Sequence, residues 1–198
     1  MDNPASERLN RYRTAPNALT LLRICLAPFL VAAILDGHYV LGFCLFAAAG
    51  LTDLLDGLLA RLLKQRSVLG QYLDPVADKL LLSTLFLVLL HKGLMPTTVT
   101  VLVLGRDVGI LLVAAILYAV AGRREFGPSL LGKANTVAQV AAVAAVLLQQ
   151  LPQLNSAHWV VLFRLVALDA TIGLTVASGL HYAWLVARRM GVNGHIAK

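Results

Sequence analysis

Six long apolar stretches constrain this chain more than any other feature of its sequence. A helix needs about 20 mostly apolar residues to cross a bilayer, and candidates occupy 18–35, 39–60, 73–90, 97–121, 129–151 and 159–187. Of the 198 residues, 59% are hydrophobic and 14% are charged, and the mean hydropathy is +0.77. A soluble core of this size cannot bury so much apolar surface. The sequence therefore predicts an all-α polytopic membrane protein with six transmembrane helices, and it argues against secreted, disordered and nucleic-acid-binding classes.

The basic residues predict how these helices are oriented. The chain has 17 Lys and Arg against 10 Asp and Glu, a net charge of +7. With a cytoplasmic N-terminus, twelve basic residues fall on the inside, Lys92 alone falls outside, and Arg23, Lys79, Arg106 and Arg164 fall within spans. This asymmetry follows the positive-inside rule. We expect one domain over 1–198, in which the basic leader 1–14 either lies along the membrane surface or is a frayed tail.

Four carboxylates gather at one predicted hairpin. Asp53 and Asp56 lie near the cytoplasmic end of the second span, and Asp74 and Asp78 near the cytoplasmic start of the third. The spacings of three and four residues place each pair on one helical face. Ionised groups inside a bilayer are costly and usually line a functional site.

Such a cluster requires neutralisation, since nearby carboxylates repel one another. An all-oxygen ligand set suits Mg²⁺ or Mn²⁺, and paired ions of this kind serve phosphoryl transfer. One alternative is that the acids form structural salt bridges with nearby basic residues, Arg23, Arg61, Lys64 and Lys79. A second alternative is a cation or proton transporter, which would distribute its acids through the membrane.

The acids belong to one continuous pattern that resembles a known family. The pattern is Asp53-x₂-Asp56-Gly57-x₂-Ala60-Arg61-x₈-Gly70-x₃-Asp74-x₃-Asp78. It resembles the signature of the CDP-alcohol phosphotransferase family at every position. The upstream run Pro16-Asn17-x₂-Thr20-x₂-Arg23-x₄-Pro28 also resembles the start of the phosphatidylglycerophosphate and cardiolipin synthase members.

The resemblance implies a site and a reaction. It implies a multi-pass membrane protein, commonly a homodimer, whose active site faces the cytoplasm at a bacterial inner membrane or its organellar equivalent. It implies that CDP-diacylglycerol is the donor, that CMP leaves, and that Asp78 is the catalytic base. Two divalent ions, Mg²⁺ or Mn²⁺, would be held by Asp53, Asp56, Asp74 and Asp78. The donor would contact Asp53, Gly57, Ala60, Arg61, Gly70 and Asp74.

Two further motifs bear on the acceptor. Lys133, Asn135 and neighbouring polar residues open the fifth span, where a cation and a helix N-terminus suit a phosphate; a snorkelling lysine is the alternative. Arg106 in the fourth span can reach the acceptor, or pair with Asp107 or Asp169. We therefore assign Lys133, Asn135 and Arg106 to acceptor binding.

The same motifs suggest which alcohol the acceptor is. The Gly-Lys-x-Asn-Thr and Arg-Asp-Val runs look more like those of cardiolipin synthase members. The favoured acceptor is therefore phosphatidylglycerol, and the alternative is glycerol 3-phosphate.

Overall fold

The protein is an array of six helices within the described residues. The computed structural model describes residues 15–63, 68–121 and 130–193, and the side chains of 22–53, 77–113 and 130–184. The helices are α2 (Ala15–Leu35), α3 (Tyr39–Leu63), α4 (Val68–His91), α5 (Thr97–Ala121), α6 (Leu130–Gln149) and α7 (His158–Asn193). No strand occurs in these ranges. The predicted all-α class is therefore confirmed.

Two tight turns match the predicted breaks between apolar stretches. Gly37 and Gly93 adopt positive φ angles of 79° and 70°. In each turn the glycine N–H donates to a carbonyl three residues back, and the following N–H donates to one five residues back, as in His38 to Ala33 and Leu94 to Leu89. This pair of bonds is the Schellman ending of a helix. Both turns reverse the chain, which sets α3 beside α2 and starts α5 close to the end of α4.

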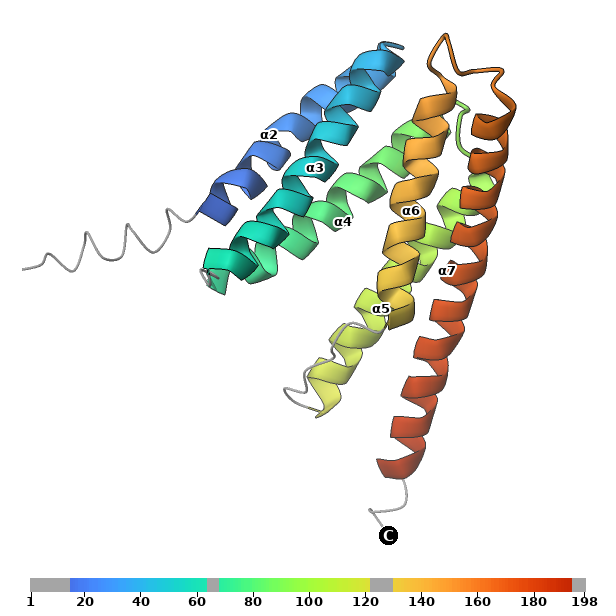
Figure 1. The fold of residues 1–198 in the computed structure, drawn as a ribbon. Helices are drawn as coiled ribbons and strands as arrows, with labels where there is room; N and C mark the ends of the chain where they lie inside the picture. The colour runs from blue at the N-terminus through green and yellow to red at the C-terminus, as the bar shows by residue number, and fades with distance from the viewer. Residues whose placement is uncertain (1–14, 64–67, 122–129, 194–198) are drawn as a thin grey trace, which may run out of the picture.

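Helix α4 crosses the molecule and joins its two halves (Figure 1). On one side, α2 packs against both α3 and α4; on the other, α6 and α7 form the most extensive helix pair. Helix α5 packs against α4 and α7. Side chains of α4 therefore reach toward α2 as well as toward α5 and α6.

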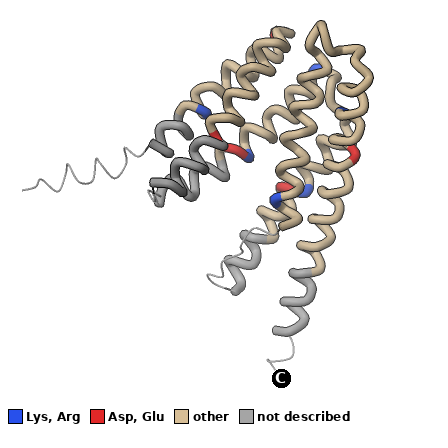
Figure 2. The backbone as a smooth tube through the Cα atoms, viewed as in Figure 1, with Lys and Arg blue, Asp and Glu red and all other residues tan. Residues whose placement is uncertain are grey.

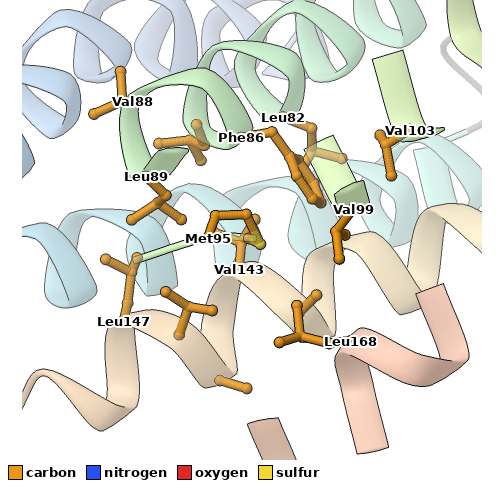
Figure 3. Packing of buried hydrophobic residues seen from close by; sticks show 14 of the residues in the cluster. Leu82, Phe86, Val88, Leu89, Met95, Val99, Val103, Val143, Leu147 and Leu168 are labelled. Atoms are coloured by element: carbon orange, nitrogen blue, oxygen red, sulfur yellow. The ribbon is translucent and has the colours of Figure 1, made fainter. Parts of the chain in front are cut away.

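The core is apolar and lies where α4 meets α5, α6 and α7. Phe86, Leu85 and Leu89 of α4 are fully buried, and they pack with residues such as Val143 of α6 (Figure 3). Burying side chains of this size stabilises a fold by about 1.5–3 kcal/mol each relative to exposure to water. This core fixes α4 and thereby positions the acidic and basic residues near its beginning.

The outer surface is also apolar. Large hydrophobic side chains are exposed on α5, α6 and α7, among them Leu111 at 67%, Val137 at 69% and Leu180 at 67%. Within the described residues, two helices are long and apolar enough to cross a membrane, Leu130–Gln149 and His158–Trp184. Shorter apolar segments are Leu22–Leu35 and Tyr39–Asp53.

Six helices are confirmed, whereas six membrane spans stay a prediction, as does the single domain over 1–198. The leader 1–14 lies outside the described residues.

Candidate active site

The first and last aspartates of the acidic pattern meet at one arginine. Arg23 of α2 is 3% exposed, and its Nη2 lies 3.0 Å from Oδ1 of Asp53 on α3. Its Nη1 donates to Oδ1 of Asp78 on α4. The two carboxylates come from positions 25 residues apart in the sequence, and α2 brings them together because it packs against both of their helices.

The remaining pattern residues can be placed on helices only. Asp56, Gly57, Ala60 and Arg61 belong to α3, and Gly70 and Asp74 to α4, but their side chains lie outside the described residues. The backbone that carries these residues is helical in both α3 and α4. The predicted arrangement of each group along one helical face stays a prediction. The roles assigned to these residues stay predictions.

The two described carboxylates, Asp53 and Asp78, are chemically suited to a cation site. Asp53 and Asp78 converge on the positive charge of Arg23, and their side chains remain 56% and 36% exposed. Oxygen ligands that converge and stay accessible suit a hard divalent ion. No group of three or more His, Cys, Asp or Glu lies together among the described side chains; the predicted quartet also needs Asp56 and Asp74, which lie outside them. The salt-bridge alternative is seen for Arg23, while Lys79 pairs elsewhere.

An apolar pocket of about 420 Å³ adjoins this site. It runs between α2 and α4 and reaches Arg23 at one end. Its lining residues are Arg23, Ile24, Ala27, Pro28, Val31, Ala77, Leu80, Leu81 and Thr84. The guanidinium and the neighbouring carboxylates therefore stand at the edge of a space that suits hydrocarbon.

A second polar cluster lies on another side of α4. Lys79 Nζ is 2.5 Å from Oδ2 of Asp107 on α5, and 3.4 Å from Oε1 of Gln139 on α6. Arg106 Nη1 donates to Asp107 at 3.0 Å, and its Nε donates to Ser178 of α7 at 3.0 Å. Figure 2 shows blue and red positions close together in both halves of the molecule. Asp78 therefore links α4 to α2, whereas the next residue, Lys79, links α4 to α5 and α6.

The three predicted acceptor residues occupy different environments. Lys133 is exposed near the start of α6. Asn135 is fully buried, and its Oδ1 accepts a hydrogen bond of 3.0 Å from Thr175. Arg106 is held by Asp107 and Ser178 and lies 5.9 Å from the ring centroid of Tyr182. Of the pairings considered for Arg106, the one with Asp107 is therefore observed among the described residues.

Two buried amides belong to the polar run of α6 in which the sequence places the acceptor residue Asn135. The Nδ2 of Asn135 and the Nε2 of Gln139 are buried without a hydrogen-bond partner among the described residues. Buried donors usually have a partner, so these two N–H groups are donors that a polar group could satisfy. The sequence reasoning missed the pairing of Lys79 with Asp107. The signal available was the depth of Asp107 in its span, since an acid there needs a cation.

Together these features define an all-helical protein with a partly exposed carboxylate pair, a buried arginine and an apolar pocket at one site. Comparison with known proteins identifies its family. Residues 13–181 match the family model for CDP-alcohol phosphatidyltransferase. The chain belongs to this family of enzymes, which argues against the transporter alternative.

Similar proteins include two kinds of synthase. The chain is 38% identical to human cardiolipin synthase (CMP-forming) over 150 residues, which cover 67% of this chain and 49% of the relative. It is 34% identical to a probable phosphatidylglycerophosphate synthase of Mycobacterium tuberculosis over 187 residues, covering 91% and 85%. It is 33% identical to a CDP-diacylglycerol–glycerol-3-phosphate 3-phosphatidyltransferase of Bacillus subtilis over 184 residues, covering 84% and 92%. The matched region spans about half the length of the human cardiolipin synthase.

Proposed function

We propose that the protein transfers a phosphatidyl group from CDP-diacylglycerol to the hydroxyl of phosphatidylglycerol, which yields cardiolipin and CMP. The single observation that carries the proposal is the meeting of Asp53 and Asp78 at Arg23. This contact joins the two ends of the acidic pattern into one site, as a shared phosphate-handling centre requires. The family match supplies the reaction class.

The surroundings of Arg23 suit an amphiphilic donor. The pocket between α2 and α4 is lined mostly by apolar side chains, so an acyl chain of the donor would lose little by leaving the bilayer for it. The charged groups at its edge would then face the diphosphate. In this arrangement the donor keeps its chains in an apolar medium while its headgroup reaches the polar site.

The residues would share the chemistry as follows. Asp53, Asp56, Asp74 and Asp78 would hold two divalent ions, Mg²⁺ or Mn²⁺, which offset negative charge on the diphosphate when bound. Asp78 would accept the proton of the attacking hydroxyl. The acceptor oxygen forms a bond to the lipid-side phosphorus, and the bond from that phosphorus to the oxygen of CMP breaks. Arg23 would hold Asp53 and Asp78 in place, which reduces the reorganisation needed for reaction.

The acceptor would approach from the α5–α6 side of the site. Lys133, Asn135 and Arg106 are the proposed acceptor residues. Lys79 follows Asp78 in the sequence and contacts Asp107 of α5 and Gln139 of α6. Phosphatidylglycerol and glycerol 3-phosphate both carry a phosphate and a free hydroxyl. The similarity to cardiolipin synthase and the Gly-Lys-x-Asn-Thr run that contains Asn135 favour phosphatidylglycerol. The similarity to a phosphatidylglycerophosphate synthase covers more of both chains, so glycerol 3-phosphate stays the alternative.

The chain would sit in the membrane as six spans with the carboxylates at the cytoplasmic side. The exposed apolar surface of α5, α6 and α7 supports this placement, as do Trp159 and Trp184, which are exposed at 57% and 56% and stand where interfacial tryptophans are expected. We also propose a homodimer, in line with the family resemblance.

An acceptor screen tests the proposed reaction. Purified protein in lipid nanodiscs would receive CDP-diacylglycerol, Mg²⁺ and either phosphatidylglycerol or glycerol 3-phosphate, and lipid products would be identified by mass. We expect cardiolipin, and CMP release only when an acceptor is present. Phosphatidylglycerophosphate as the sole product would establish the alternative acceptor. Absence of CMP release with every lipid and polyol acceptor would refute the proposed function.

A further inference from the structure

Helix α7 presents a broad apolar face away from the rest of the molecule. Its segment His158–Trp184 is long and apolar enough to cross a membrane, and only 28% of an apolar 18-residue stretch within it is buried. The helix lies at an edge of the array, with α6 as its most extensive neighbour (Figure 1). The large exposed side chains on it include Trp159, Leu162, Leu165, Val166, Val176, Leu180 and Trp184.

One carboxylate interrupts this apolar face. Asp169 is exposed, and no ion pair or hydrogen bond joins its side chain to any other described residue. It stands ten residues after Trp159 and fifteen before Trp184, which correspond to about 15 Å and about 22 Å along a helix. If the two tryptophans mark the membrane interfaces, Asp169 lies near the middle of the hydrocarbon.

The polar residues on the inward face of α7 have hydrogen-bond partners within the chain, unlike Asp169. Thr171 donates to the carbonyl of Ala138 at 3.0 Å, and Thr175 donates to Asn135 at 3.0 Å. Ser178 accepts from Arg106 at 3.0 Å. These side chains are buried and hydrogen-bonded within the chain. An acid on the opposite side, facing lipid, is costly unless another group covers it.

Small residues follow Asp169 on the same face. Gly173 and Ala177 lie four and eight residues further on, and both are exposed. A Cβ added to Gly173 would meet no atom within 4 Å, so packing within this chain does not require glycine there. Small residues at four-residue spacing allow a second membrane helix to approach closely.

We propose that the face of α7 formed by Asp169, Gly173 and Ala177 docks a membrane-spanning helix of another protein that carries a Lys or Arg near its midpoint. The carboxylate supplies the charge that such a helix needs, and the small residues supply the close approach. This inference rests on one part of the proposed membrane placement, namely that α7 crosses the bilayer.

Charge favours a different protein over a second copy of this chain. A symmetric α7–α7 contact would bring two Asp169 carboxylates together. The cations within the predicted spans are engaged inside the chain: Arg23, Lys79 and Arg106 with carboxylates, and Arg164 with Gln149 and the carbonyl of Leu94 at 2.8 Å each. Lys133 is exposed but lies near the start of α6, so among the described residues no free cation lies near the middle of a predicted span to neutralise Asp169 of a neighbouring copy.

Fluorescence transfer from the tryptophans of α7 tests this directly. Both tryptophans of the chain lie on α7, so energy transfer to a dansyl group on an added helix reports contact with this element. The probes are leucine-rich peptides of about 20 residues, without tryptophan, that carry Lys, Leu or Glu at the midpoint. The full-length protein is reconstituted with each peptide in phosphatidylcholine vesicles.

We expect the Lys peptide to reach half-maximal transfer at a peptide-to-lipid ratio at least tenfold lower than the Leu or Glu peptide. Asp169→Leu should remove that preference, Gly173→Ile should reduce it at least threefold, and Asp36→Leu, outside the span, should leave it unchanged. Equal transfer from all three peptides would overturn the proposal, as would a Lys preference that survives Asp169→Leu. Cross-linking of Gly173→Cys between two copies that excludes the Lys peptide would also overturn it, in favour of self-association.

The catalytic assay on the same samples keeps this test separate from the proposed function. Asp169 lies outside the catalytic residues, so Asp169→Leu should retain CMP release. Lys-selective transfer by a protein that never releases CMP would support the docking face and count only against the enzyme activity.

Discussion

At the scale of single residues, Arg23 organises the site. It is almost fully buried and holds two partly exposed carboxylates. Removing one partner of a buried charge pair is usually costly, because the other charge is left uncompensated. A guanidinium also suits this position better than an ammonium, since its planar donors can serve two carboxylates at once. Arg23 therefore fixes the distance between α3 and α4 at the point where chemistry is proposed.

Asp78→Asn tests the proposed base. The change keeps the side-chain volume and removes the proton acceptor, so we expect CMP release to fall by roughly 10²–10⁴-fold with the helical content unchanged. The measurement is the initial rate of CMP release at saturating donor. Asp36→Asn, in the exposed turn after α2, is the matched control and should retain the wild-type rate. A rate for Asp78→Asn within twofold of wild type would contradict the assignment.

Sequence reasoning reached part of the site at this scale. The pattern predicted that Asp53 and Asp78 belong together, because helical spacing and a hairpin leave little freedom in where they can lie. It did not predict that Lys79 pairs with Asp107. That contact joins different helices, and side-chain pairing across helices depends on rotation and tilt that a single sequence does not encode in its periodicity.

At the scale of elements, helix boundaries follow from local chemistry. The turns at Gly37 and Gly93 were predictable, because glycine ends a helix readily in the left-handed conformation. The start of α4 was not: the helix begins at Val68, whereas the apolar stretch begins near position 73. Hydropathy locates the part of a helix that suits a bilayer, and a helix can extend beyond that part through polar residues.

Two glycine substitutions with opposite expected signs test this account of the turns. Gly37→Ala should destabilise the protein by about 1–2 kcal/mol, because a Cβ disfavours the left-handed backbone. Gly50→Ala, inside α3 where an added Cβ meets no atom within 4 Å, should stabilise it by about 0.5–1 kcal/mol. The measurement is the free energy of unfolding in mixed micelles. Equal effects of both changes would contradict the assigned turn geometry.

At the scale of the whole molecule, polar contacts join α4, α5, α6 and α7 across the apolar core. Lys79 reaches Asp107 and Gln139, and Arg106 reaches Ser178. In a low-dielectric interior such contacts are strong once formed and costly when half-removed. They connect the helices that carry the proposed acceptor residues to the helix that carries Asp78.

A double-mutant cycle measures this connection. Lys79→Met and Asp107→Leu should each destabilise the protein, and the pair should show a coupling of about 0.5–3 kcal/mol in the free energy of unfolding. Lys79→Met combined with Asp36→Asn should be additive within about 0.5 kcal/mol, because the two sites share no contact. Additivity of Lys79→Met and Asp107→Leu would show that the ion pair contributes nothing to holding α4 and α5 together.

The central claim is that the aspartates of α3 and α4 hold divalent ions at the site of phosphatidyl transfer, and Mn²⁺ binding tests it most directly. Electron paramagnetic resonance of free Mn²⁺, titrated into the purified protein with CDP-diacylglycerol present, gives the number of ions bound. We predict two per chain for the wild type, at least tenfold weaker binding for Asp53→Asn and Asp78→Asn, and no change for Asp36→Asn. Wild-type protein that binds no Mn²⁺ under these conditions, or binding unaffected by both site substitutions, would contradict the claim.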